Sequence, residues 1–398
     1  METDLYKSDF IDEFDTSGSN QSLMRQRNER LVLTILRRQG PLPKADIARK
    51  TGLSAQTVSV IMRALERDGL LERGEKLRGK IGQPSIPMRL APQGAFVFGL
   101  KVGRRSAELS LVNFVGEEVA HLIQTYDYPT PELTLNFATS AVRELSQNLT
   151  PAQRHRIAGI GIAAPFFLWE WAGMIGVEPA KMAAWKGFDL CAEIARHFDF
   201  PAYLGNDASC ACSAELTFGT TETPPDFLYL YIGYFVGGGL ALNGTLFTGR
   251  SGNAGAIGPF PVITRDGAQT QLVNAASLIG LERRLEHRDG DASHIVTQSK
   301  SWHIDEDVLE DWLNEAVPAL ARCVVGAISI IDLPAVLLDG NMPVTLRAKI
   351  VERLRAAIHD LPLSGLVPPE IREGSLGARA RPLGAASLPL SKRFMLDS

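Results

Sequence analysis

One stretch of the chain, residues 43–73, restricts its fold more than any other. It reads PKADIARKTGLSAQTVSVIMRALERDGLLER. Gly52 separates two helical segments, and Ser54 is placed to cap the second by accepting a hydrogen bond from a free backbone N–H. In the second segment apolar residues recur at helical spacing, at Val58, Ile61, Met62 and Leu65. The pattern predicts a helix-turn-helix that runs into a β-wing.

The opposite face of the second helix is predicted to be polar. A winged helix lays this helix in the major groove of DNA, where Gln and Arg side chains suit bidentate contacts with base edges. Lys44, at the start of the first helix, is expected to contact a phosphate. Within this stretch, we predict that DNA is contacted by Lys44, Ser54, Gln56, Thr57, Ser59 and Arg63. The alternative is a small helical domain that binds only protein.

Charge favours DNA over a protein partner. Residues 21–90 contain fifteen Lys and Arg against six Asp and Glu, whereas the whole chain has a formal net charge of −4. A basic module on an otherwise acidic protein is typical of a domain that contacts the phosphate backbone of nucleic acid. We therefore expect a double-stranded DNA operator to be the partner of this module.

The predicted wing follows Leu70 and carries a basic turn. Arg78, Lys80 and Gln83 lie in that turn, which can reach phosphates or enter a narrow minor groove. The alternative is a solvated surface loop, because charged loops are common on protein surfaces. Upstream, residues 21–40 are predicted to form the first helix of the module, ended by Gly40 and Pro41.

Composition excludes several classes of protein. Residues 1–20 are acidic, lack the basic and apolar regions of a signal peptide, and are expected to form a disordered tail. No apolar run approaches the length of a transmembrane helix, so no membrane partner is expected. The four cysteines form neither a disulfide framework nor a CxxC pair, which suits a reducing cytoplasm. We expect no cofactor and no metal.

Beyond Pro92 the pattern changes to strands that alternate with helices. Three β-rich runs at hairpin spacing lie within residues 96–128, and a helical stretch and a buried strand follow at 131–149 and 157–165. The cycle restarts near Asp226, with further helices around 274–288 and 305–331. Such alternation predicts an α/β domain, and the restart predicts two similar lobes, residues 91–220 and 226–398. Ligands of these folds bind at the carboxyl ends of strands.

The order of these motifs resembles the ROK family (repressors, open reading frames, kinases). The markers are GLKVG at 99–103, GIGIAAP at 159–165, GND at 205–207 and GGGLALNGTLFTGRSGNAGAIG at 237–258. The resemblance implies a winged helix at 21–90 joined to a ROK domain at 91–398 with a two-lobed, actin-like (ribonuclease H-like) α/β fold. It also implies a sugar site and, in kinase members, a neighbouring ATP site.

The residues that correspond to the family's phosphate loops have changed. The first loop, Asp-x-Gly-Gly-Thr in the family, corresponds to Lys101, Val102, Gly103, Arg104 and Arg105, so that an acidic residue has become a cation. In the second loop, residues 233–239, Tyr234 and Phe235 stand where a polyphosphate requires small residues and free N–H groups. We therefore predict a protein that is not a kinase and has no catalytic residues.

The sugar site is only partly retained. Asn206 and Asp207 match the family pair that binds sugar hydroxyls, although either could instead cap the helix that follows. The family's Glu-x-Gly-His motif corresponds to Ala256, Ile257, Gly258 and Pro259. Each lost anchor to a buried hydroxyl costs about 1–3 kcal/mol. The family's structural zinc is predicted to be absent, because its His corresponds to Pro259 and no Cys or His follows within residues 260–277.

An aromatic loop at residues 165–174 has two interpretations. Phe166, Phe167, Trp169 and Trp171 could stack on a ligand, or they could form core or a subunit interface.

These observations predict a cytoplasmic, homodimeric or homotetrameric DNA-binding regulator, expected to be a repressor. Its non-catalytic ROK domain would respond to a sugar or a sugar-derived molecule. One alternative is a regulator that uses this domain only to oligomerise, and another is a ROK sugar kinase.

Overall fold

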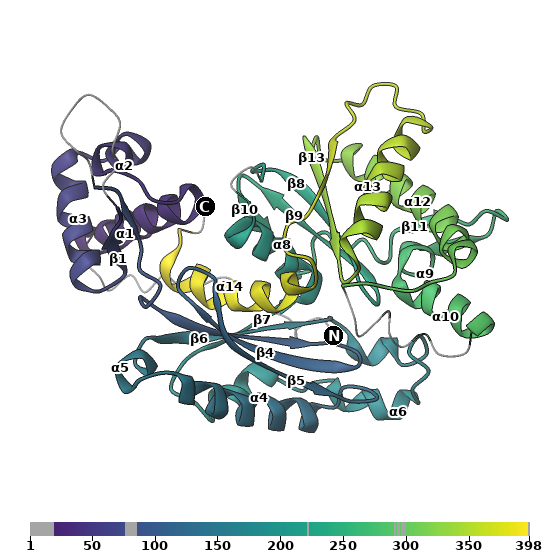
Figure 1. Ribbon diagram of the computed structural model, residues 1–398, viewed down its shortest axis with the longest axis horizontal. Helices are drawn as coiled ribbons and strands as arrows, with labels where there is room; N and C mark the ends of the chain where they lie inside the picture. The colour runs from purple at the N-terminus through teal and green to yellow at the C-terminus, as the bar shows by residue number, and fades with distance from the viewer. Residues whose placement is uncertain are drawn as a thin grey trace. The chain divides into compact units, whose positions relative to one another are not determined.

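The computed structural model describes residues 20–75, 86–220, 223–289, 292, 295 and 300–396 (Figure 1). These residues divide into two compact units. Unit 1 extends to Gly205 and resumes at Ala385, and unit 2 comprises Asn206–Gly384. Among the described residues, no helix is both long enough and apolar enough to cross a lipid bilayer.

Unit 1 opens with the predicted winged helix-turn-helix, called the DNA module below. It contains α1 (Asn20–Gln39), α2 (Lys44–Thr51), α3 (Ala55–Arg67) and an antiparallel pair, β1 (Leu71–Arg73) and β2 (Met88–Leu90). Gly52 ends α2 in the left-handed region at φ 70°, and Ser54 Oγ caps α3 by accepting from the Thr57 N–H at 3.1 Å. The predicted apolar stripe is buried, at Val58, Ile61, Met62 and Leu65.

The rest of unit 1 is built on a five-stranded sheet. Its strands are β3 (Phe96–Val102), β4 (Ser106–Asn113), β5 (Glu118–Thr125), β6 (Ile157–Ala164) and β7 (Ala202–Asn206), in the order β5-β4-β3-β6-β7. β3, β4 and β5 form the predicted antiparallel meander, and β6 runs parallel to β3. α4 (Pro131–Leu145) packs against the meander (Figure 1). The short helices are η1 (Ser146–Asn148), α5 (Pro151–Arg154), η2 (Leu168–Trp171), α6 (Pro179–Met182), η3 (Ala183–Trp185) and α7 (Leu190–Ala195).

Unit 2 repeats the strand pattern of unit 1. Its strands are β8 (Phe227–Ile232), β9 (Val236–Leu242), β10 (Thr245–Phe247), β13 (Ala335–Gly340) and β14 (Glu370–Glu373), in the order β10-β9-β8-β13-β14. Again three antiparallel strands are followed by two parallel ones. This repetition confirms the prediction of two similar α/β lobes.

Helices surround the sheet of unit 2. They are α8 (Asp207–Phe218), α9 (Leu272–Ala276), α10 (Leu278–Asp289), α12 (Glu306–Ile328), α13 (Val344–His359) and η4 (Gly377–Arg379), and a small hairpin joins β11 (Pro261–Ile263) to β12 (Gln269–Gln271). α8 packs against β9, and α13 packs against β13 and β14. α14 (Ala380–Phe394) begins in unit 2 and continues in unit 1.

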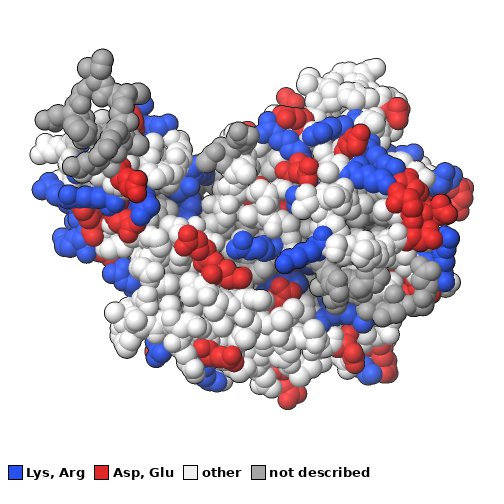
Figure 2. Space-filling model, in the orientation of Figure 1, with Lys and Arg blue, Asp and Glu red and all other residues white. Residues whose placement is uncertain are grey.

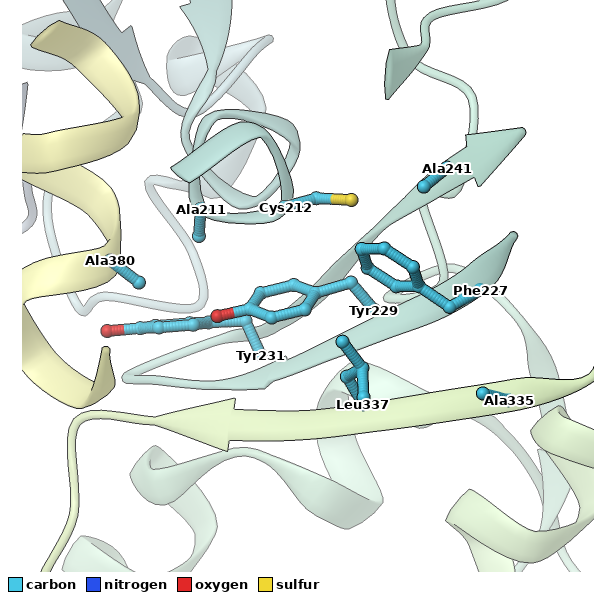
Figure 3. Packing of buried hydrophobic residues seen from close by; sticks show 9 residues of the cluster. All are labelled: Ala211, Cys212, Phe227, Tyr229, Tyr231, Ala241, Ala335, Leu337 and Ala380. Carbon is cyan, nitrogen blue, oxygen red and sulfur yellow. The ribbon is translucent and has the colours of Figure 1, made fainter. Parts of the chain in front are cut away.

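A core of aromatic and small residues lies between α8 and the sheet of unit 2 (Figure 3). The rings of Tyr229 and Tyr231 lie 6.4 Å apart between centroids, and Figure 3 shows their hydroxyls pointing toward α14. β9 can approach α8 because it carries glycine. A Cβ on Gly239 would lie 2.5 Å from that of Cys212, and one on Gly237 would lie 2.7 Å from that of Ala208. The glycine run at 237–239 therefore serves helix–strand packing.

Gly239→Ala is expected to destabilise the protein, because the new methyl group has no space between β9 and α8. Overpacking of this kind costs roughly 1–3 kcal/mol of unfolding free energy. Urea denaturation of the wild type and the variant measures the loss. Gly173→Ala is the matched control, since a Cβ there meets no atom within 4 Å. Equal midpoints for the two variants would contradict the packing role of Gly239.

Candidate functional site

The exposed face of α3 carries most of the predicted base-reading residues. Gln56 and Arg63 are exposed, and Thr57 and Ser59 are partly exposed. The Nε of Arg63 donates to the Ser59 carbonyl at 3.1 Å, which orients the guanidinium along the helix surface. Ser54 is exposed, but its hydroxyl is engaged in the cap, so its contact with DNA stays a prediction.

Exposed cations accompany this face. Figure 2 shows Lys and Arg side chains on the DNA module, with a few acidic side chains among them. Arg49 pairs with Asp46, and Arg73 pairs with Glu66. Lys44 and Arg63 form no ion pair with any residue that the structure describes, so both charges are available to an anionic partner. The predicted wing residues Arg78, Lys80 and Gln83 lie outside the described residues.

Within unit 1 the DNA module is held to the five-stranded sheet by an arginine. The Nη2 of Arg37, on α1, donates to the carbonyl of Phe114, and its guanidinium lies 5.3 Å from the centroid of the Phe114 ring. Desolvation lowers the pKa of Arg37 to about 10, so the side chain keeps its charge at neutral pH. The charge therefore strengthens both contacts with Phe114.

Three further sets of contacts fix the same junction. Arg156 reaches the carbonyls of Gly69, Gln93 and Gly94 at 3.3–3.4 Å. At the end of α14 the ring of Phe394 lies 5.0 Å from that of Phe114, edge to face. The Leu396 N–H then donates to Thr34 Oγ1 on α1 at 2.9 Å. The carboxyl end of the chain is thus joined to the DNA module.

The predicted ligand residues lie at the start of α8, where both already have partners. The Asn206 side chain caps α8 by accepting from the N–H groups of Ala208 and Ser209 at 3.1 and 3.3 Å. Asp207 Oδ2 accepts from Arg381 Nη1 at 3.2 Å, and both side chains are largely buried. The role of Asn206 and Asp207 in ligand binding stays a prediction.

Arg381 is the residue of this site that sequence reasoning missed. It belongs to the first turn of α14, and its guanidinium carbon lies 4.9 Å from the centroid of the Tyr231 ring. Burial raises the pKa of Tyr231 to about 12, so the hydroxyl is neutral. An arginine that is 174 residues away from its partner leaves no local signal in the sequence.

A second missed cluster of unit 2 holds the turn before α14. The fully buried Asp339 accepts from Tyr229 Oη at 3.0 Å, from Arg347 Nη1 at 2.8 Å and from the Gly377 N–H at 2.9 Å. Glu215 accepts from the N–H and the hydroxyl of Ser375 at 3.1 and 2.7 Å. Burial raises the pKa of Glu215. The two carboxylates thereby fix the turn from Ser375 to Gly377.

The turn that corresponds to the family's second phosphate loop is occupied by contacts within unit 2. The carbonyls of Gly233 and Tyr234 accept from the N–H groups of Leu278 and Ile279, the first residues of α10. The amides that a helix N-terminus would offer to a phosphate are therefore already used. The Tyr234 side chain is buried in contact with Phe235, at 5.0 Å between ring centroids.

The residues that correspond to the first phosphate loop form the end of a hairpin in unit 1. Lys101 on β3 pairs with Glu108, its cross-strand neighbour on β4, at 2.5 Å. Arg104 donates to the carbonyl of Ile175 at 3.3 Å. In unit 2, Ala256 and Pro259 are exposed. Over the described part of the chain, no three His, Cys, Asp or Glu side chains are grouped to hold a metal ion.

Family models match both parts of the chain. The model of the ROK family matches residues 97–392, and a model described as winged helix-turn-helix DNA-binding matches residues 25–72. The chain belongs to the ROK family. The winged helix and the two-lobed α/β fold that the sequence analysis predicted are therefore confirmed as those of a ROK protein.

Individual relatives of this ROK chain are distant. The y4fQ protein of Sinorhizobium fredii is 24% identical over 371 residues, which cover 92% of this chain and 91% of that protein. The xylose repressor of Caldicellulosiruptor bescii is 25% identical over 239 residues, 60% of this chain and 59% of the repressor, so the match spans less than two thirds of that protein.

Among solved structures, this chain resembles a ROK family transcriptional regulator described as a homologue of the Escherichia coli Mlc protein. The TM-score is 0.66 at 19% identity, with 92% of this chain and 96% of that chain covered. At this identity the likeness shows the fold.

Arg37→Met is expected to loosen the DNA module, because the Phe114 carbonyl loses its donor. An unsatisfied buried carbonyl costs about 1–3 kcal/mol. Limited proteolysis should therefore cut faster between the module and β3. Arg27→Met is the control, since it removes an exposed arginine from the same helix. If both variants are cut at the wild-type rate, Arg37 does not hold the junction.

Proposed function

We propose that this ROK protein is a DNA-binding transcriptional repressor whose ROK domain takes a small sugar-like ligand and does not transfer phosphate. The observation that carries the proposal is the DNA module, in which Ser54 caps α3 and Gln56 and Arg63 are exposed on one side of it. A xylose repressor and a regulator structure among its relatives support the same function.

In the proposed complex, α3 lies in the major groove of duplex DNA. Gln56 and Arg63 read base edges through paired hydrogen bonds, and Thr57 and Ser59 add single contacts. Lys44 neutralises a phosphate, and Arg78, Lys80 and Gln83 of the wing reach the backbone or the minor groove. The protein acts as a homodimer or homotetramer, so two modules bind half-sites that are related by the same symmetry.

Two groups of contacts support a non-catalytic ROK domain. The carbonyls of Gly233 and Tyr234 and the first amides of α10 satisfy each other, and Lys101 is neutralised by Glu108. These groups are therefore engaged within the protein at the places that correspond to the family's phosphate loops. Asp207, the expected acceptor of a sugar hydroxyl, is likewise paired with Arg381 and thus is not a free general base.

The ion pair at Asp207 favours a second candidate, a regulator that binds no ligand and uses the ROK domain only for oligomerisation. A ligand that binds the folded state raises the melting temperature, so thermal-shift measurements with sugars separate the two candidates.

Substitutions in α3 and in the wing are expected to change DNA binding in different ways. Arg63→Ala should weaken binding to a selected operator by about 1–3 kcal/mol and relax sequence preference at one position, because a base contact is lost. Arg78→Ala should lower the slope of log affinity against log salt by about one and leave the preference unchanged. Fluorescence anisotropy with operators obtained by in vitro selection, across a salt series, measures both.

Arg265→Ala serves as the control for both variants, because Arg265 is an exposed arginine of unit 2. A wild-type protein whose affinity for duplex DNA does not change with salt would contradict the proposed function.

Phosphate transfer is expected to be absent. With ATP, magnesium and each of glucose, xylose and N-acetylglucosamine, a coupled assay should detect no ADP above the sugar-free rate, because Lys101 is paired with Glu108 and the first amides of α10 are bonded to the turn at Gly233 and Tyr234. A ROK glucokinase serves as the positive control. Sugar-stimulated ADP release by this chain would establish a kinase instead.

A further inference from the structure

Helix α14 is one continuous element that contacts the predicted ligand residue Asp207 near its start and leads to the DNA module at its end. Its first turns, up to Gly384, belong to unit 2, and its remainder belongs to unit 1. Within unit 2, Arg381 pairs with Asp207. Within unit 1, Phe394 packs on Phe114 and the following residues reach α1. A helix transmits displacement along its axis through its backbone hydrogen bonds, of which Pro389 removes one in α14.

Close backbone contacts hold α14 firmly on both sides of the unit boundary. In unit 2 a Cβ on Gly384 would lie 1.9 Å from the Cys210 carbonyl oxygen of α8. In unit 1 a Cβ on Gly161 of β6 would lie 1.7 Å from the Ala385 carbonyl oxygen. The part of α14 that lies on β6 therefore moves with unit 1, and so with the DNA module.

The Asp207–Arg381 ion pair is able to open, because the charge of each partner is also stabilised by a second interaction. Asp207 is the first residue of α8, where the helix dipole stabilises a carboxylate. Arg381 lies over the Tyr231 ring, which retains a cation–π contact without Asp207. A buried ion pair with no such alternatives would be far more costly to separate.

The charge balance of this site selects the chemistry of its ligand. Asp207 and Arg381 together are neutral and largely buried, so a ligand with a net charge would leave that charge uncompensated. An uncharged ligand with adjacent hydroxyl groups satisfies the Asp207 carboxylate by donating to it, without adding charge. The site therefore favours a neutral polyhydroxylated molecule over an acidic one.

We propose that Arg381 is a tethered counter-ion that occupies the ligand's place on Asp207, and that a neutral polyhydroxylated ligand binds by displacing it. Displacement releases the first turn of α14 from α8, whereas Asp339 and Glu215 still hold the preceding turn from Ser375 to Gly377. The part of α14 in unit 2 thereby loses one of its contacts within that unit. The inference rests on the proposed function for its ligand class, and it adds Arg381 as the competitor and α14 as the connection.

Arg381→Gln tests the competition, because glutamine keeps a donor but removes the charge. D-xylose, D-glucose, N-acetyl-D-glucosamine and D-glucuronate are titrated into the full-length protein by calorimetry, after a thermal-shift screen. We expect a neutral sugar to bind Arg381→Gln about tenfold more tightly than the wild type, since an ionic competitor has been weakened. Arg379→Gln is the matched control, because it removes an exposed arginine two residues earlier and should bind as the wild type does.

Hydrogen exchange of the wild-type protein tests the release of α14 without any variant. The neutral sugar should speed exchange of the backbone amides of Arg381, Leu383 and Gly384, the part of α14 in unit 2, although ordinary ligand binding slows exchange near a site. Arg381→Gln should show the fast exchange before sugar is added, and Arg379→Gln should not.

Several results would overturn the inference. They are equal sugar affinity in the wild type and Arg381→Gln, slower exchange in α14 on binding, no binding of any sugar to either protein, or glucuronate binding that Arg381→Gln abolishes. The last would make Arg381 a direct ligand contact. Binding to duplex DNA, measured separately, distinguishes this failure from failure of the proposed function. A protein that binds its operator but shows none of these sugar effects loses only the inference.

Discussion

The position of α14 depends on one buried carboxylate, that of Asp339 at the end of β13. Four kinds of donor surround it: the Tyr229 hydroxyl, the Arg347 guanidinium, its neighbour Gly340 N–H and the N–H groups at Leu376 and Gly377. An ionised side chain is tolerated in such a place only when its oxygens are fully hydrogen-bonded. Arg347 also bonds to Glu373 at 3.0 Å, so the ends of β13 and β14 are joined through one guanidinium. These bonds therefore fix the turn from which the chain enters α14.

The same requirement for close approach explains the glycines of this protein better than phosphate binding does. A Cβ on Gly374 would lie 2.6 Å from the Cβ of Asp339, and one on Gly239 would meet Cys212. These glycines bring backbone to within contact of a carboxylate or of a helix. The glycine-rich motif thus serves packing in this chain, next to Tyr234 and Phe235. Because the fold itself needs the small residues, the motif alone is no evidence of catalysis.

Local physical chemistry predicted much of the fold, and long-range pairing accounts for what it missed. Ser54 as a cap, Gly52 as a helix end and the stripe from Val58 to Leu65 each depend on neighbours within one or two turns. The repeated order of strands and helices was likewise visible as a restart near Asp226. The partners of Asp207 and Asp339 were not, because Arg381 and Gly377 come from distant segments that only the folded sheet brings near. Asn206 and Asp207 could therefore be predicted as ligand residues from the sequence, but the internal cation that pairs with Asp207 could not.

If a ligand displaces Arg381 as proposed, ligand binding and DNA binding affect each other to the same extent. Linkage is reciprocal, so a ligand that weakens operator binding by some factor must itself be bound less tightly, by the same factor, when the operator is present. A tenfold effect per protomer corresponds to about 1.4 kcal/mol. This free energy is too small to shift a single two-state equilibrium from almost entirely one state to almost entirely the other. If two protomers must bind two half-sites at the same time, their two tenfold effects multiply to about a hundredfold. An ion pair such as Asp207–Arg381 would thus suffice for a switch only in an oligomer whose protomers bind two half-sites together.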